Sequence, residues 1–198
     1  MDDALLASTD EGTALKIMSI ARFLVATSGD SLPHIETWQL THPIPYTDGI
    51  TEDVYYNLFK SIGIDETFRQ RLFRERCRQF GDNPLIAFDS TTQSTYSENQ
   101  IDARYGFNKA KDGLKTIKHL TLCSVNNRRP IAFAKQPGNL PDATSLSNAL
   151  KQLDILGIHN PEAVTGNGYC SEENLADMRL SSFRFIALVK TGNGKGKC

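Results

Sequence analysis

Hydrophobic residues along the chain follow two different spacings, and the change falls near Gly81. Before this point apolar residues recur every three or four positions, which is the period of an amphipathic helix. After it they form short runs rich in β-branched and aromatic residues, which is typical of strands. We therefore expect a helical region over residues 1–80, an α/β region over 81–191 and a flexible tail at 192–198.

The first region contains two helices with recognisable start signals. Residues 14–27 have helical spacing and follow Thr9 and Asp10, either of which can cap the helix. A proline-containing loop is expected over 28–49. Thr51 then caps a second helix, whose first turn carries acidic residues that favour the positive end of the helix dipole.

A third helix is predicted from Asp65 to Phe80 by an apolar stripe. The stripe consists of Phe68, Leu72, Phe73, Cys77 and Phe80. The other faces carry five arginines: Arg69, Arg71, Arg74, Arg76 and Arg78. Such a helix can contact the phosphate backbone of DNA. The alternative is a solvent-exposed face whose charge is partly balanced by Glu66 and Glu75.

The second region alternates strands and helices. Strands are predicted, in order, at 84–89, 117–125, 130–135, 162–166 and 184–190. Turn residues between the second and third strands favour an antiparallel hairpin. Helices with clear caps are predicted at 142–156 and 171–180. The expected fold class is thus α/β, with three antiparallel strands followed by parallel strand-helix-strand units.

This order resembles an RNase H-like mixed sheet. In that arrangement the end of the first strand lies beside the end of the fourth. Asp89 closes the apolar run at 84–89, so we expect its carboxylate at the sheet edge, near residues 165–168. An isolated aspartate at a strand end can also be a turn or helix-cap residue.

The composition is typical of a globular protein and does not identify a ligand. Of 198 residues, 39% are hydrophobic and 23% charged, and the net charge is −1. Any nucleic-acid contact must therefore come from a local basic patch. The four cysteines contain no CxxC pair and no zinc spacing, which favours reduced thiols. No apolar run is long enough to span a bilayer. We expect a cytoplasmic protein with no membrane partner.

Four blocks of sequence are similar to the DDE transposases of bacterial insertion sequences, whose RNase H-like core is interrupted by an insertion domain. The blocks are AFDSTT at 87–92, YGFNKAKDGLK at 105–115, RPIAFAKQPGNLPDATSL at 129–146 and VTGNGYCSEENL at 164–175. The resemblance implies a partial catalytic core, with DNA at the ends of a mobile element as partner. It also implies DNA strand cleavage and transfer in the intact family member.

The resemblance assigns Asp89 as the first metal-binding and catalytic aspartate. In this chemistry two Mg²⁺ or Mn²⁺ ions, held by clustered carboxylates, polarise the attacking and leaving oxygens of a phosphoryl transfer. The second acid of the family aligns with Gly166, which has no side chain for a metal. The third acid lies on a helix beyond the last residue, Cys198. We therefore expect a truncated chain in which metal binding is doubtful and catalysis is absent.

A second basic segment lies at 105–115, where Lys109, Lys111 and Lys115 lie near Tyr105 and Phe107. It can lie along a DNA path, or it can be an exposed connection between strands. The glycine- and lysine-rich tail resembles a phosphate-binding loop, but no helix follows its lysines, as such a loop requires.

Two functions remain open at this point. The first is an insertion-sequence transposase that has become inactive. The second is a non-catalytic DNA-binding or oligomerising fragment that interferes with an intact transposase through the helix that carries Arg69 to Arg78. Expected protein partners are a second copy of the chain or an intact transposase. With either function the chain would be nucleoid-associated in a bacterial cell when bound to DNA.

Overall fold

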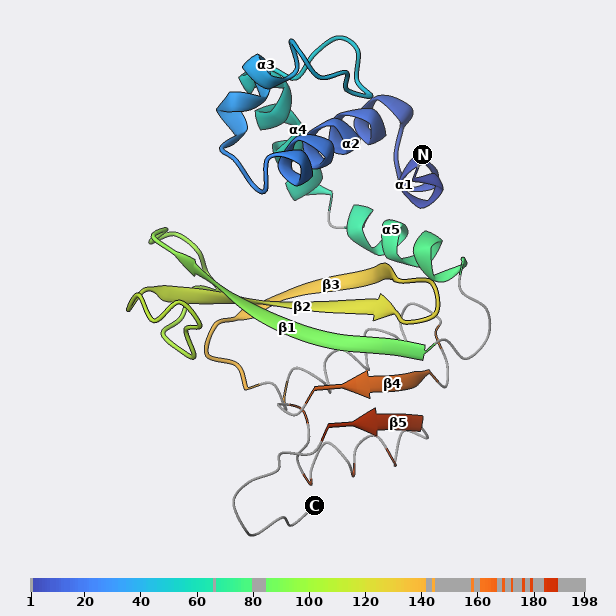
Figure 1. The fold of residues 1–198 in the computed structure, drawn as a ribbon, viewed down its shortest axis with the longest axis vertical. Coiled ribbons are helices and arrows are strands. Elements are labelled where there is room, and N and C mark those ends of the chain that lie inside the picture. Colours follow the sequence, from blue (N-terminus) through green and yellow to red (C-terminus); the bar gives the residue numbers. More distant parts are fainter. Residues whose placement is uncertain are drawn as a thin grey trace. The chain divides into compact units, whose positions relative to one another are not determined.

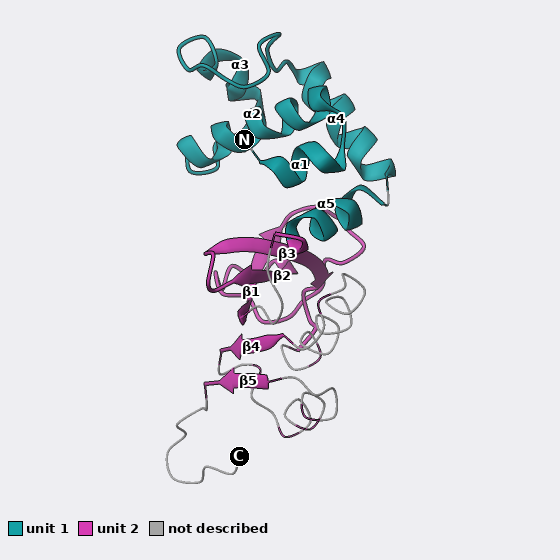
Figure 2. Cartoon of the chain, turned by 90° about the vertical axis from the view of Figure 1, so that its right-hand side faces the viewer, with its two compact units in different colours: residues 1–76 teal, residues 77–198 magenta. Residues whose placement is uncertain are grey.

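The computed structural model describes residues 2–65, 67–79, 85–141, 161–166 and 184–188, with single positions at 144, 158, 169, 172, 176 and 179. Its described helices are α1 (Asp3–Ser8), α2 (Glu11–Ala26), the 3-10 helix η1 (Leu32–His34), α3 (Ile35–Trp38), α4 (Glu52–Ile64) and α5 (Phe68–Cys77). Its described strands are β1 (Leu85–Thr95), β2 (Lys115–Ser124), β3 (Arg129–Pro137), β4 (Glu162–Thr165) and β5 (Arg184–Ala187). Figure 1 shows this order of helices followed by a sheet. The chain divides into two compact units, residues 1–76 and 77–198, which are coloured separately in Figure 2.

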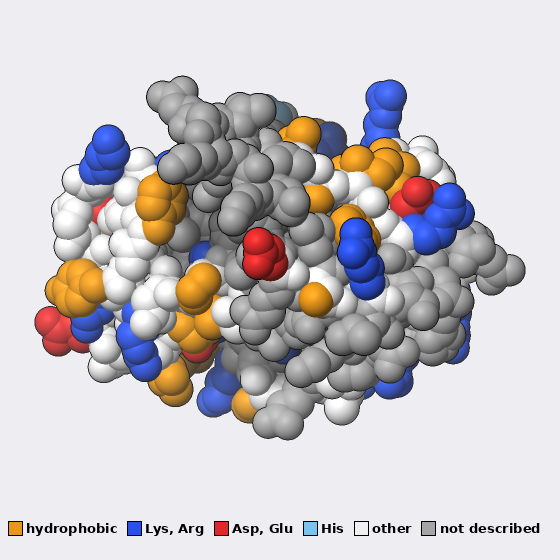
Figure 3. Space-filling model, turned by 90° about the horizontal axis from the view of Figure 1, so that it is seen from below, with side chains coloured by type: hydrophobic (Ala, Val, Ile, Leu, Met, Phe, Trp, Pro, Cys, Tyr) orange, Lys and Arg blue, Asp and Glu red, His pale blue; other side chains and the backbone are white. Residues whose placement is uncertain are grey.

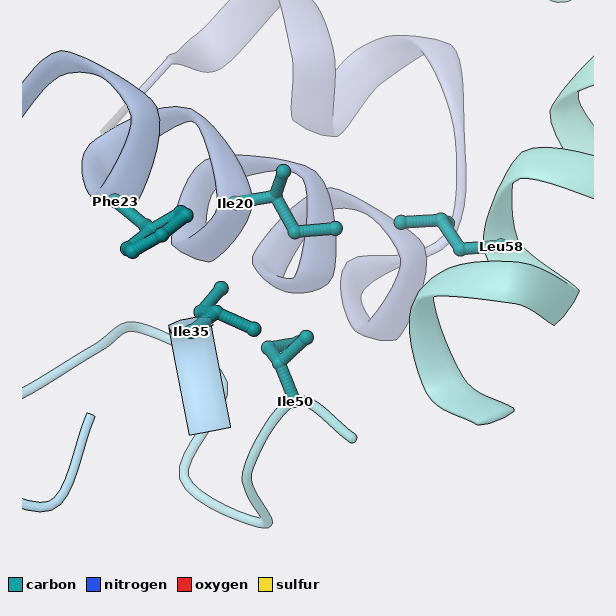
Figure 4. Packing of buried hydrophobic residues seen from close by; sticks show 5 residues of the cluster. All are labelled: Ile20, Phe23, Ile35, Ile50 and Leu58. Atoms are coloured by element: carbon teal, nitrogen blue, oxygen red, sulfur yellow. The ribbon is translucent and has the colours of Figure 1, made fainter. Parts of the chain in front are cut away.

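The first unit is organised around a cluster of buried aliphatic and aromatic side chains. Its fully or nearly buried members are Ile20, Phe23, Ile35, Ile50 and Leu58. In Figure 4 these side chains converge from α2, α3, α4 and the segment before α4. The rings of Phe23 and Trp38 pack in a T-shaped arrangement, with 5.5 Å between their centroids. Burial of these side chains is the main source of stability for so short a set of helices.

The helix starts predicted from sequence are confirmed at two positions. The Asp10 carboxylate accepts a hydrogen bond from Thr13 N at 2.9 Å, and α2 begins at the next residue, Glu11. The Thr51 hydroxyl accepts from Val54 N, and α4 begins at Glu52. In both cases the side chain satisfies an amide that has no partner within the helix.

The expected loop over 28–49 is in part helical, because η1 and α3 lie within it. One helical turn is too short to produce a hydrophobic period, so its sequence carried no signal. Ile35 is fully buried and anchors this turn in the core. The Gln39 side chain closes the loop by accepting from Ile50 N at 2.7 Å and donating to Ile50 O at 3.1 Å.

The second unit contains the expected mixed sheet. The strand order is β3-β2-β1-β4-β5. β1 pairs antiparallel with β2, and β2 pairs antiparallel with β3. β4 and β5 both run parallel to β1. The α/β class with three antiparallel and two parallel strands is therefore confirmed.

The first strand of this sheet is longer than the sequence predicts. β1 was expected to end at Asp89 but continues to Thr95, because its hydroxyl-rich second half pairs with β2. Threonine fits a half-exposed pleated strand well, even though its polarity resembles that of a turn. The predicted helices at 142–156 and 171–180, the residue Phe80 and the tail at 192–198 lie almost entirely outside the described residues. Among the described residues, no helix has the length and hydropathy needed to cross a bilayer.

We predict that one ion pair makes unfolding of the first unit depend on pH. Asp65 accepts hydrogen bonds from Thr67 N and Phe68 N, and its carboxylate meets the Arg71 guanidinium at 2.6 Å. The hydrogen bonds with Arg71 and Thr67 lower the pKa of Asp65 from 3.8 to about 2. A depressed pKa means that the stabilisation is complete above the unfolded-state pKa and is lost as the pH falls toward 2.

The measurement compares the urea midpoints of the wild type and Asp65→Asn, because asparagine keeps the cap acceptor without the charge. Trp38, the only tryptophan, reports on the first unit. The difference between the two midpoints should be constant near neutral pH and should shrink from about pH 4 to about pH 2. A difference that does not change with pH would show that the charge contributes nothing.

Candidate functional site

Asp89 lies where the parallel pairing between β1 and β4 stops. The last pair of that ladder is Phe88 with Thr165, so Asp89 and Gly166 are the next positions on their two strands. The Asp89 side chain is exposed, and one of its carboxylate oxygens accepts from Ser90 N at 2.9 Å. The two positions expected to be neighbours are therefore brought to the same point of the sheet.

The residues around Asp89 on its face of the sheet are mostly uncharged. Thr121 lies opposite on β2, and Phe133 lies opposite Thr121 on β3. His119 is two positions from Thr121 and shares this face. Because its position depends on the register of the hairpin, the sequence alone gave no sign of it. Within the described ranges, no group of three or more His, Cys, Asp or Glu side chains could hold a metal ion.

Gly166, at the position predicted for the second acid, has no side chain to bind a metal, although the backbone would accept one. A Cβ built on Gly166 meets no atom within 4 Å, and its backbone is outside the left-handed region that favours glycine. A two-ion site needs several carboxylates. Among the described residues at this strand end, Asp89 supplies one, so they do not fit a pair of divalent ions.

Two of the arginines predicted to bind DNA have partners within the first unit. Besides its ion pair with Asp65, Arg71 donates through Nε to Ser8 O at 3.1 Å. The Arg76 guanidinium meets the Asp2 carboxylate at 3.2 Å and is half-buried. These two side chains connect α5 to the start of the chain, so a structural role accounts for them.

Arg69 and Arg74 differ from these two. Both are exposed, and neither has a hydrogen bond or ion pair within the described part of the chain. Arg78 is exposed as well. The arginine-rich helix therefore offers fewer available cations than its sequence suggests.

The second basic segment connects β1 to β2. Lys109 and Lys111 are exposed there, in a turn where the Asn108 side chain accepts from Ala110 N at 2.9 Å and Lys111 N at 3.2 Å. Nearby, the Lys115 ammonium lies 5.8 Å from the centre of the Tyr105 ring. On the face shown in Figure 3, the described lysines and arginines are spread out, with hydrophobic side chains between them.

Comparison with known proteins identifies the family. The model of the transposase DDE domain matches residues 80–195, which is more than half of the chain. The chain belongs to the transposase DDE domain family. The predicted resemblance to DDE transposases is thus confirmed. No curated protein sequence matches the chain.

Comparison with solved structures shows a similar fold in a transposase. The chain is similar to piggyBac transposase in a synaptic complex with hairpin DNA, with a TM-score of 0.54 and 11% identity. That match covers 94% of this chain and 43% of the piggyBac chain. A Mos1 transposase paired-end complex matches with a TM-score of 0.38 and 9% identity, over 86% of this chain and 58% of that one. A simian T-cell lymphotropic virus intasome matches with a TM-score of 0.37 and 13% identity, over 87% and 52%.

We predict that Gly166→Asp creates a divalent-metal site at this strand end. The new carboxylate has room and lies beside Asp89, so the two can share one ion. Free Mn²⁺, followed by its electron paramagnetic resonance signal, should show binding that is tighter than in the wild type by about tenfold or more. Gly166→Asn, which has the same size without the charge, should not bind, and Asp89→Asn should abolish the gain. Equal Mn²⁺ affinity in the wild type and Gly166→Asp would contradict our interpretation of Gly166.

Proposed function

We propose that this chain takes part in DNA transposition as an insertion-sequence transposase that binds DNA but does not cut it. The observation that carries the proposal is the pair of positions at the end of the β1–β4 ladder. The family match supports Asp89 as the first catalytic acid. The position beside it, where the second acid is expected, is occupied by Gly166. DNA is the partner expected for a DDE domain, and the solved relatives named above include transposases in complexes with DNA or transposon ends.

The absence of cleavage follows from electrostatics. In-line phosphoryl transfer builds negative charge on the attacking and leaving oxygens, and two cations held by carboxylates normally offset it. Asp89 alone would leave a divalent ion bound mostly by water, in a position that no second side chain of the described residues fixes. DNA binding needs no such ion, because it depends on Lys and Arg contacts with phosphates. Binding without cleavage is therefore chemically consistent.

We predict that the purified 198-residue chain does not nick supercoiled plasmid in Mg²⁺ or Mn²⁺. Wild type and Asp89→Ala should give the same background level of open circles, because the second acid is missing in both. Agarose gels of a time course measure this, with a nonspecific nuclease as the positive control. Metal-dependent nicking that disappears in Asp89→Ala would overturn the proposal of inactivity.

A second candidate function is interference with an intact transposase by a non-catalytic DNA-binding protein. Exposed Arg69 and Arg74 favour it, because they have no partner in the described part of the chain. Such a protein would occupy DNA or associate with the active enzyme without performing chemistry. It differs from the first candidate in requiring binding by α5.

We predict that Arg69→Ala combined with Arg74→Ala weakens binding to duplex DNA and lowers its salt dependence. Each lost phosphate contact should reduce the slope of log K against log[salt] by about 0.9. Fluorescence anisotropy over a series of salt concentrations measures both quantities. Arg22→Ala is the matched control, because Arg22 is an exposed arginine on α2 in the same unit. An unchanged slope in the double variant would exclude α5 as a DNA-binding element.

A further inference from the structure

A pocket of about 250 Å³ lies in the second unit beside the strand that carries Asp89. Its lining includes hydroxyls, two lysines, an amide and an exposed aromatic ring. These belong to Ser90, Thr92, Lys109, Lys118, Asn139 and Phe107.

Two paired strands, β1 and β2, supply polar side chains to the pocket, and β3 lies beside them. Thr92 on β1, Lys118 on β2 and Gln136 on β3 lie opposite one another and share a face of the sheet. Lys118 and Gln136 are each only 6% exposed. The Lys118 ammonium donates to Leu140 O at the rim. Gln136 Oε1 is buried beside it without a hydrogen-bond partner.

The wall of the pocket is held by close backbone packing. A Cβ at Gly106 would collide with the backbone of Gly138, so these two backbone segments are in direct contact. Gly138 N also donates to Asp102 O at 3.2 Å. Arg104 and Thr116 exchange two backbone hydrogen bonds, at 3.0 and 2.9 Å. The segment that presents Phe107 and Lys109 is therefore fixed against β2 and the end of β3.

The ring of Phe107 lines the pocket although the residue is 78% exposed. An exposed aromatic ring beside cations and hydroxyls is the combination that binds single-stranded nucleic acid. Bases stack on the ring while cations contact the phosphates. In a duplex, both faces of each base are covered by its neighbours, so the ring would have no base to stack on. The combination therefore favours an unpaired nucleotide.

We propose that this pocket binds one unpaired nucleotide of a DNA strand. Its phosphate would lie near Lys109 and Lys118 with the hydroxyls of Ser90 and Thr92, and its base would stack on Phe107. The inference rests on the proposed DNA-binding function and specifies which form of DNA is bound. It requires neither a metal ion nor a second acid at position 166.

The test compares a fluorescein-labelled oligothymidylate with a duplex of the same length at about 50 mM salt. Phe107→Ala should weaken binding of the single strand about fivefold to a hundredfold, which is the loss expected for one stacked base. Binding of the duplex should change by less than about twofold. Tyr96→Ala is the matched control, because Tyr96 is 87% exposed on the same connection but does not line the pocket. Phe107→Trp should restore binding.

A competition experiment locates the phosphate and separates a free nucleotide from a strand. Thymidine 5′-monophosphate should displace the oligomer at high concentration, whereas thymidine should not. Lys109→Ala should remove this difference. Lys111→Ala should keep it, because Lys111 is exposed two residues away but does not line the pocket. Displacement by the monophosphate at the affinity of the strand itself would indicate a mononucleotide site and overturn the proposal.

The outcomes distinguish the inference from the function on which it rests. Binding of the duplex without binding of the single strand would overturn the pocket and leave the proposed function intact. Failure to bind either DNA would remove both. Equal losses in Phe107→Ala and Tyr96→Ala would show a diffuse aromatic surface rather than a pocket, and would also overturn the inference.

Discussion

The parallel ladder between β1 and β4 is the constraint on which the functional region depends. These strands are far apart in the sequence, and their pairing brings Asp89 to Gly166 and fixes which residues share a face. A shift of one residue would turn Asp89 to the opposite face, because side chains alternate along a strand. The buried residues Ile86, Phe88 and Ala163 set this register from the other side of the sheet. The position of the carboxylate is thus determined by apolar packing one residue away.

The continuation of β1 beyond Asp89 changes the chemistry that this region can offer. Asp89 faces Thr121 and Phe133, whereas Ser90 and Thr92 line a pocket with two lysines. β1 therefore presents a single carboxylate at Asp89 and, within three residues of it, the hydroxyls of Ser90 and Thr92. These hydroxyls line the same pocket as two lysines from other segments, and the combination suits a phosphate. The positive charge of the two lysines attracts a nucleic-acid strand without a metal ion, whereas the negative charge of Asp89 does not.

The sequence was sufficient for those features that depend on local pattern, and insufficient for those that depend on register. The hairpin between β2 and β3 and the caps at Asp10 and Thr51 followed from turn and cap residues. The single turn of α3 did not, since it has no period, and neither did the second half of β1, whose polar residues resemble a turn. The pocket was missed because Lys118 and Thr92 become neighbours only when the antiparallel ladder is known. Likewise, the sequence showed five arginines at 69–78 but not which of them form ion pairs with Asp65 and Asp2.

The sheet does not determine which residue stands at position 166, where the family resemblance predicts the second acid. The backbone of Gly166 does not require glycine, and the space around it would admit a side chain, so the sheet itself does not explain the residue. Glycine in an extended segment even costs conformational entropy. Two adjacent carboxylates without a cation would repel each other, however, and one of them would be forced to bind a proton. With Asp89 and no carboxylate at position 166, this strand end avoids that repulsion. The register of β1 and β4 is set by buried apolar residues on the opposite face of the sheet, so it does not require a metal ion.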